Sequence, residues 1–208
     1  MPWQMLALFY ALFLAFCIDL SELCSCQRSH PQEKFCNSDF VILARVKQYQ
    51  VFNTTKVYKA RIKKYFKLSE KAEVALKSGR LLTPNGDSLC ESSLSPGKLY
   101  VLSGRVVHLK AVINLCGMAY PWKTLTKRQR KGFKMMYRHG CVCKISSFVE
   151  SKNSCLWPKS RTNSLRCYEE EGICLPSPSK VCRWAKSAAL TKCIHPHDKR
   201  LTISRWSG

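Results

Sequence analysis

The chain has 208 residues, with 35 lysines and arginines against 13 acidic residues and a formal net charge of +22. Its 13 cysteines are more than a protein of a reducing compartment normally carries, which disfavours a cytosolic location. The charge indicates polyanionic partners, and for a secreted chain these are sulfated glycosaminoglycans and anionic cell surfaces, with no nucleic acid.

The first 23 residues are predicted to be a signal peptide. Residues 5–16 are almost entirely apolar, yet shorter than the roughly 20 residues that span a bilayer, so no membrane span is expected. Cleavage before Cys24 removes Cys17, two acids and no base, which leaves twelve cysteines and a net charge of +24. An even number of cysteines in a secreted chain predicts a disulfide framework. The alternative is a buried N-terminal helix of the mature fold.

The new N-terminus would read Cys24-Ser25-Cys26. The free α-amine and the carbonyl oxygen of one residue can close a five-membered ring around a metal ion, and an α-amine titrates about 2.5 pH units below a lysine amine. A secreted chain that begins this way could block a zinc enzyme. The other interpretation of this spacing, and of Cys141-x-Cys143, is a pair of thiolate metal ligands.

Two strands are predicted next. Residues 39–47 have one wholly apolar face, and in residues 56–63 apolar positions alternate with Lys59, Arg61 and Lys63. This row of cations is either a glycosaminoglycan site or a solvated face. Between the strands, Asn53 begins a glycosylation sequon, which predicts an exposed hairpin connection.

The following elements alternate between helix and strand. We predict a short helix over residues 69–77, a turn over 83–86, and β segments over 98–107 and 111–116. Residues 126–137 form the most clearly predicted helix.

That helix begins with Thr126 and Gln129 at capping-box spacing, and Phe133, Met136 and Tyr137 form an apolar edge. A mainly β domain with one flanking helix is compatible with a small closed barrel of the oligonucleotide/oligosaccharide-binding type, the OB-fold.

After Gly140, seven cysteines fall close together among Pro, Ser and Lys, which predicts a second, smaller domain stabilised by cross-links. The tail from His195 is polar, so His195 and His197 are expected to be solvated in preference to binding a metal.

An ordered set of motifs resembles the tissue inhibitors of metalloproteinases. The motifs are Cys24-Ser-Cys, His30-Pro-Gln, Phe35-Cys-Asn-Ser-Asp39, Pro121-Trp122, Gln129-Arg-Lys-Gly-Phe133, Gly140-Cys141, Cys155-Leu-Trp157 and Cys182-Arg-Trp184. The resemblance implies an inhibitory, netrin-like OB-fold barrel of five strands over residues 24–141. It also implies a small disulfide-rich C-terminal domain over residues 142–208.

The resemblance further implies a secreted, monomeric inhibitor and not an enzyme. It would form a 1:1 complex with matrix metalloproteinases or ADAM-type enzymes in the extracellular matrix, with no cofactor of its own. Cys24 would coordinate the catalytic zinc of the target protease through its α-amine and carbonyl, and Ser25 would enter the specificity pocket. The other protease contacts implied are Cys26, Gln27, Arg28, Ser88 and Leu89.

The disulfides are implied in the same way. They are Cys24–Cys90, Cys26–Cys116, Cys36–Cys141, Cys143–Cys182 and Cys155–Cys174. The vertebrate-type pattern has two further cysteines, bonded to each other, between Cys143 and Cys155, and this chain lacks both. Cys167 and Cys193 are extra, and they are expected to bond to each other as in similar insect-type chains.

Two other functions are weighed against inhibition. A netrin-like module that binds matrix or heparan sulfate would tolerate residues in front of Cys24, whereas inhibition requires Cys24 to be the first residue. A hydrolase would need a catalytic constellation, but His30 and His108 have no nucleophile at a recognisable motif spacing and no H-E-x-x-H occurs.

Overall fold

The computed structural model describes residues 24–86, 90–147, 151–157 and 163–195. The predicted signal peptide, the protease contacts Ser88 and Leu89, and His197 lie outside the described residues. Within the described ranges, no helix is both long and apolar enough to cross a membrane.

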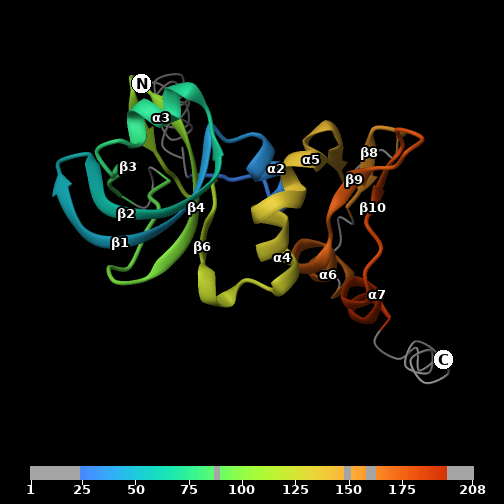
Figure 1. The fold of residues 1–208 in the computed structure, drawn as a ribbon. Helices are drawn as coiled ribbons and strands as arrows, with labels where there is room; N and C mark the ends of the chain where they lie inside the picture. Colours follow the sequence, from blue (N-terminus) through green and yellow to red (C-terminus); the bar gives the residue numbers. More distant parts are fainter. Residues whose placement is uncertain (1–23, 87–89, 148–150, 158–162, 196–208) are drawn as a thin grey trace, which may run out of the picture.

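Five strands form a sheet that closes on itself (Figure 1). They pair in the order β1-β2-β3-β5-β4, and β4 also pairs with β1, so the pairing forms a ring. All neighbours are antiparallel except β3 and β5, and β6 adds to the edge of β4. The strands are β1 (Phe40–Phe52), β2 (Thr55–Leu68), β3 (Arg80–Pro84), β4 (Leu99–Val107), β5 (Lys110–Val112) and β6 (Ala119–Pro121). The predicted mainly β barrel is confirmed.

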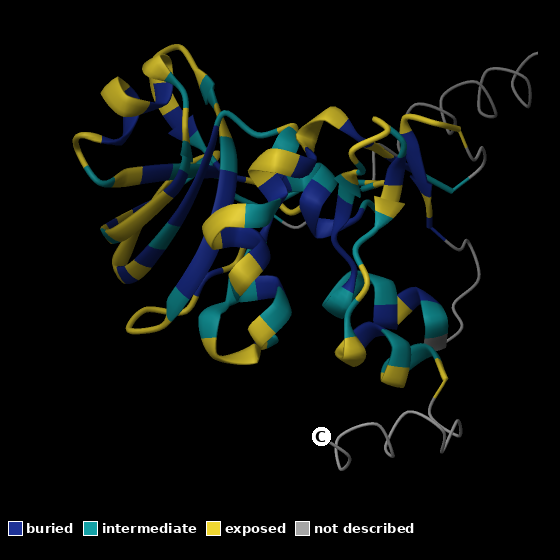
Figure 2. Cartoon of the chain, turned by 45° about the vertical axis from the view of Figure 1, so that its right-hand side comes forward, coloured by how far each residue is buried: buried dark blue, intermediate teal, exposed yellow. Residues whose placement is uncertain are grey.

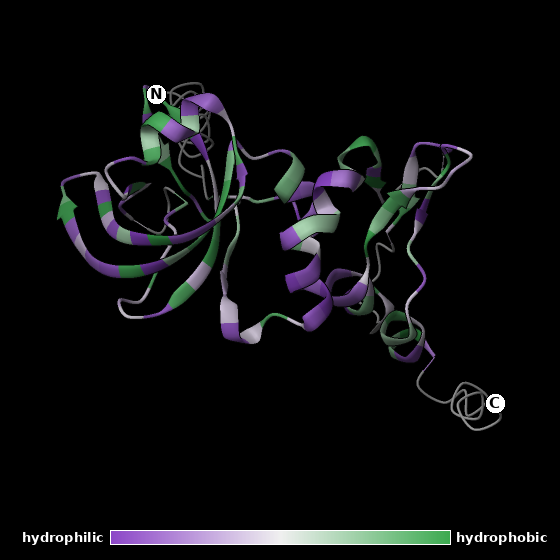
Figure 3. Cartoon of the chain, in the orientation of Figure 1, coloured by the Kyte–Doolittle hydropathy of each residue, from purple (hydrophilic) through white to green (hydrophobic). Residues whose placement is uncertain are grey.

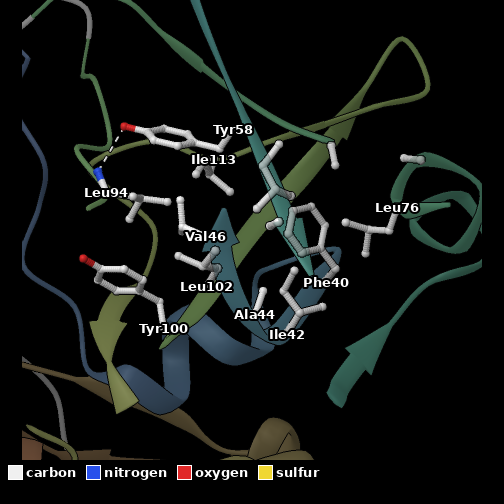
Figure 4. Close-up of a cluster of buried hydrophobic side chains, with 14 of the residues drawn as sticks. Phe40, Ile42, Ala44, Val46, Tyr58, Leu76, Leu94, Tyr100, Leu102 and Ile113 are labelled. Carbon is white, nitrogen blue, oxygen red and sulfur yellow. Dashed lines mark hydrogen bonds between the residues drawn. The ribbon is translucent and has the colours of Figure 1, made fainter. Parts of the chain in front are cut away.

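The barrel core follows from the alternation in β1. Phe40, Ile42, Ala44 and Val46 are all fully buried, and Figure 4 shows them pointing into one cluster. Tyr58 of β2 joins them, and its hydroxyl accepts a hydrogen bond from the Leu94 amide at 3.0 Å. In Figure 3, hydrophobic and hydrophilic residues alternate along both strands, as expected for strands with one face buried.

Several predicted boundaries change. β1 continues to Phe52, beyond the predicted 39–47, because the hairpin extends past the barrel core with mostly exposed side chains. β2 continues to Leu68, beyond the predicted 56–63, because its last residues pair with the start of β1, Leu68 opposite Phe40. The predicted turn over 83–86 is wrong in its first half, since Thr83 and Pro84 pair with β2. The predicted β segment over 111–116 ends at Val112.

The helices in the first part of the chain are α2 (Pro31–Cys36), α3 (Glu70–Leu76), η2 (Trp122–Thr124), α4 (Lys127–Lys131), η3 (Gly132–Met136), α5 (Tyr137–His139) and η4 (Gly140–Val142). Of these, α2, α4 and α5 lie between the barrel and the C-terminal part, whereas α3 lies over the barrel itself (Figure 1). The predicted capping box is present, with Thr126 and Gln129 each bonded to the other's backbone amide. The predicted helix over 126–137 is helical from Lys127, with Thr126 as its N-cap, but η3 is a π-helical turn that the sequence pattern does not predict.

The C-terminal part consists of short elements. They are β7 (Lys144–Ser146), β8 (Ser154–Leu156), α6 (Asn163–Glu171), β9 (Cys174–Pro176), β10 (Cys182–Trp184) and α7 (Ala188–Ile194). Their core contains Ile145, Trp157 and Leu165 packed among half-cystines.

A further apolar cluster mixes residues from both sides of position 141. Its fully buried members include Phe35, Val41, Phe133 and Tyr137 from the first part and Ile173 from the second. Figure 2 shows this buried zone between exposed surfaces on the barrel and on the C-terminal elements. The division into domains at 141 stays a prediction.

Candidate functional site

The N-terminal edge, defined here as residues 24–29, has no regular secondary structure. Ser25, Gln27 and Arg28 are exposed, whereas Cys24 and Cys26 are half-buried. The exposure alternates from Cys24 to Gln27, which indicates an extended chain whose two sulfurs face the protein while Ser25 and Gln27 face solvent.

Two neighbouring disulfides hold the N-terminal edge. Cys24 is bonded to Cys90 and Cys26 to Cys116, each with a Cα–Cα distance of 5.1 Å. The Leu115 amide donates to the carbonyl of Cys90 at 3.0 Å, so the two anchoring segments are also bonded to each other. Cys90 has a positive φ of 61°. This backbone conformation is costly for a non-glycine residue, and the disulfide and the hydrogen bond hold Cys90 in it. The edge is therefore fixed at two points before any partner binds.

The four sulfurs of these disulfides lie within 4.8 Å of one another, the one metal-like grouping among the described residues. They are bonded in pairs and are not thiolates, which argues against the thiolate-ligand interpretation. Cys141 and Cys143 are also bonded to other cysteines. The four remaining disulfides are Cys36–Cys141, Cys143–Cys182, Cys155–Cys174 and Cys167–Cys193. All six are the pairs that the resemblance implies.

The described residues on either side of Ser88 and Leu89 are both anchored. Cys90 holds one end to the N-terminal edge, and the carboxylate of Glu91 accepts from the Gly86 amide at 3.1 Å. Glu91 also forms an ion pair of 2.5 Å with Lys56, whose ammonium lies 4.6 Å from the centre of the Tyr49 ring. The hydrogen bond from Lys56 lowers the pKa of Glu91.

Sequence reasoning missed this ion pair. Glu91 gives no local signal beyond being an acid in a basic chain, and its partner lies 35 residues away.

Below the N-terminal edge, His30 is fully buried. Its Nδ1 accepts from the Gln32 amide at 3.1 Å, and its Nε2 donates to the carbonyl of Tyr168 at 2.9 Å. This pattern requires one neutral tautomer. Burial lowers the pKa of His30 to about 4, although the hydrogen bond to Tyr168 opposes the shift. His30 is thus a structural residue whose two nitrogens are both occupied, not a catalytic base.

Gln32 connects the same region to the C-terminal part. Its Nε2 donates to the carbonyls of Gly140 and Cys174 at 3.1 and 2.8 Å, and its Oε1 accepts from the Cys174 amide at 2.9 Å. The motif His30-Pro-Gln is therefore the anchor of the N-terminal edge, a role that the sequence pattern did not reveal.

Asp39 also has a structural role. Its carboxylate accepts from the Val106 amide at 2.8 Å and lies 2.9 Å from the ammonium of Lys71. Burial raises the pKa of Asp39, but the hydrogen bonds from Lys71 and Val106 outweigh it and lower the pKa overall. Asp39 therefore satisfies a backbone amide just before β1 begins.

The predicted cationic row lies on the outer side of β2. Lys59, Arg61 and Lys63 are all exposed. In the strand register, Arg61 lies opposite Arg45 of β1, and Lys59 lies opposite Arg80 of β3. Like charges directly across a strand pair destabilise a sheet, so this face has an unbalanced positive charge.

The sequon residue Asn53 is exposed in the β1–β2 turn, with a positive φ of 37°. The predicted exposed hairpin connection is confirmed. The backbone carbonyl of Asn53 accepts a hydrogen bond from Asn85 Nδ2 at 2.9 Å. The side-chain amide of Asn53 takes no part in this bond and belongs to an exposed residue.

Comparison with known proteins gives one consistent result. A family model described as "Tissue inhibitor of metalloproteinase" matches residues 22–184. "Metalloproteinase inhibitor 3" of Scyliorhinus torazame is 32% identical, over 82% of this chain and 85% of the relative. "Metalloproteinase inhibitor 2" of Homo sapiens is 30% identical, over 87% and 90%. The "Tissue inhibitor of metalloproteinase" of Drosophila melanogaster is 28% identical, over 84% and 87%.

Proposed function

Because the chain belongs to the tissue inhibitor of metalloproteinase family, we propose that it inhibits zinc metalloproteinases by inserting a mature N-terminus at Cys24 into the protease cleft. The observation that carries this proposal is the extended N-terminal edge, exposed at Ser25 and fixed by two neighbouring disulfides. A segment that is already ordered loses less conformational entropy when it binds.

In the proposed mechanism, Cys24 supplies its α-amine and carbonyl oxygen to the protease zinc. A catalytic zinc keeps an open position for water, and a neutral amine can replace that water. Position at the terminus is essential, because a preceding residue would convert the amine into an amide nitrogen whose lone pair is delocalised. The disulfide to Cys90 keeps these ligand atoms at the end of a rigid segment.

The neighbouring residues would supply the rest of the interface. Ser25 is small and exposed, which suits entry into a specificity pocket beside the zinc. Gln27 and Arg28 would extend along the cleft, and Ser88 and Leu89 would contact the protease beside them. Matrix metalloproteinases and ADAM-type enzymes are the proposed targets, in a 1:1 complex with a monomeric inhibitor.

Secretion into the extracellular matrix is part of the same proposal, and its support is the six disulfides, which persist in oxidising compartments. N-terminal sequencing of the secreted protein, followed by titration of a matrix metalloproteinase, tests both parts. We expect Cys24 as the first residue and stoichiometric loss of protease activity. A secreted protein that begins upstream of Cys24 and leaves the protease active would instead be a binding module without inhibitory activity.

A second proposed activity is binding of heparan sulfate at the β2 face, favoured by the exposed row Lys59, Arg61 and Lys63 and by the cations opposite them. Bound sulfates would offset the like-charge repulsion across the strands. Heparin-column elution of a triple Lys/Arg→Gln variant of this row tests it. We expect elution at lower salt than for a control that removes three exposed helix cations, Lys127, Lys131 and Lys134. Equal elution of the two variants would eliminate the site.

A further inference from the structure

An ion pair joins the N-terminal edge to the C-terminal part of the chain. Arg28 Nη2 lies 2.7 Å from Glu169 Oε2 on α6, although the two residues are 141 positions apart in sequence. The side chain of Glu169 is 26% exposed and that of Arg28 is 56% exposed. The pair therefore lies at the surface, where Arg28 remains available to a partner while α6 limits its movement.

The helix that carries Glu169 is itself firmly held. The disulfide between Cys167 and Cys193 bonds α6 to α7. Side chains from the barrel side bind carbonyls of its last turn: His30 Nε2 to Tyr168, Gln129 Nε2 to Glu169 and Thr126 Oγ to Glu170, at 2.9, 3.3 and 2.9 Å. Because α6 is fixed from both sides, Glu169 presents its carboxylate at a defined position relative to the N-terminal edge.

Glu169 has neighbours of both charges, because Arg28, Arg166 and Glu170 line the same crevice. Its negative charge opposes the burial that lowers the pKa of Lys34, and it adds to the burial that raises the pKa of Tyr120 to about 12. A crevice of about 440 Å³ lined by Arg28, Tyr120, Gln129 and Glu169, among others, separates the edge from α6. The ion pair crosses this crevice and gives the side chain of Arg28 a direct polar contact with α6.

We propose that Glu169 is a positioning residue for protease inhibition, which holds Arg28 and thereby keeps the end of the N-terminal edge in its extended form. This proposal rests on the proposed function. The physical reason is preorganisation, since an edge that is restrained before binding loses less entropy in the complex. Exposed ion pairs are weak, so loss of this one should weaken inhibition by about two- to fivefold.

The test compares inhibition constants of Glu169→Gln and Glu170→Gln against one matrix metalloproteinase. Glu170 is a matched control, because it is the next residue of the same helix and its ion-pair partner is Arg166, at 2.7 Å, whereas the partner of Arg28 is Glu169. We expect a weaker inhibitor only for Glu169→Gln, partial rescue by Glu169→Asp, and a smaller difference at high salt. Equal constants for the two glutamine variants would overturn the proposal.

A double-mutant cycle separates positioning from a general structural effect. If Glu169 acts through Arg28, then Glu169→Gln should have no further effect in an Arg28→Ala background. An undiminished effect in that background would contradict the proposal.

Hydrogen exchange of the amides of residues 27–29 in the free proteins gives a readout that does not need a protease. We expect faster exchange in Glu169→Gln than in Glu170→Gln, and equal exchange would contradict positioning. An inactive wild type with the expected exchange difference would refute the proposed function alone.

Discussion

At the scale of single residues, Gln32 links the start of the mature chain to its C-terminal part. Its side chain is 1% exposed and forms three hydrogen bonds to the backbone of Gly140 and Cys174. Removal of one partner leaves buried polar groups unsatisfied, and each such group costs about 1–3 kcal/mol. Gln32, which in the sequence is only one residue of the His30-Pro-Gln motif, therefore contributes strongly to the free energy of unfolding.

We expect Gln32→Ala to lower the free energy of unfolding by about 3 kcal/mol, because the Cys174 amide and two carbonyls lose their partner. Urea unfolding with the disulfides intact measures this change. Gln48→Ala on the exposed side of β1 is the matched control and should change the midpoint little. Equal midpoints for the two variants would contradict this role of Gln32.

His30 gives the stability a pH dependence of defined sign. Burial lowers its pKa in the folded protein to about 4, whereas the ordinary value is 6.5. As the pH falls, His30 is therefore protonated in the unfolded chain before it is protonated in the folded protein. The contribution of neutral His30 to the free energy of unfolding is complete above pH 6.5 and is lost as the pH falls toward 4. We expect a loss of roughly 3 kcal/mol across this window. Urea unfolding at a series of pH values measures this loss. The stability of the His30→Gln variant should depend less on pH, and an unchanged pH dependence in that variant would rule out His30 as the cause.

At the scale of elements, local periodicity predicted the parts whose burial repeats along the chain. β1 and β2 were found because Ala44 and Tyr58 belong to alternating apolar faces, and the start of α4 because Thr126 has a capping-box partner. Short elements such as β3 and α2 were missed because their pairing and packing partners are distant in sequence. The π-helical turn was missed because the apolar spacing of residues 126–137 is that of an α-helix, and it does not reveal the close contact between Gly132 and the ring of Tyr137.

That contact gives a prediction for the helix. A Cβ at Gly132 would lie 2.5 Å from the ring of Tyr137, which is itself fully buried. We expect Gly132→Ala to lower the free energy of unfolding by about 1–3 kcal/mol through overpacking, despite the better helix propensity of alanine. Thermal unfolding measures this, with exposed Lys131→Ala as the control. A Gly132→Ala protein as stable as the wild type would show that the ring can move aside.

At the scale of the whole molecule, disulfides and a mixed apolar cluster combine barrel and C-terminal elements into one support for the N-terminal edge. The candidate edge and its cystine partners could be predicted because the resemblance carries the spacing of Cys24, Cys26 and their partners. The contacts that support the N-terminal edge could not be predicted. Arg28–Glu169 and Gln32–Cys174 join residues 141 and 142 positions apart, and neither belongs to a local pattern.

We propose that a free α-amine on Cys24 is the ligand by which this protein inhibits a metalloproteinase. The most direct measurement compares the inhibition constant of the protein beginning at Cys24 with that of the same protein carrying one alanine in front of it. The added peptide bond removes the basic nitrogen and leaves both disulfides of the edge in place. We predict strong inhibition by the first protein and a loss of at least about a hundredfold, roughly 3 kcal/mol, in the second. Equal inhibition by the two proteins would contradict the account.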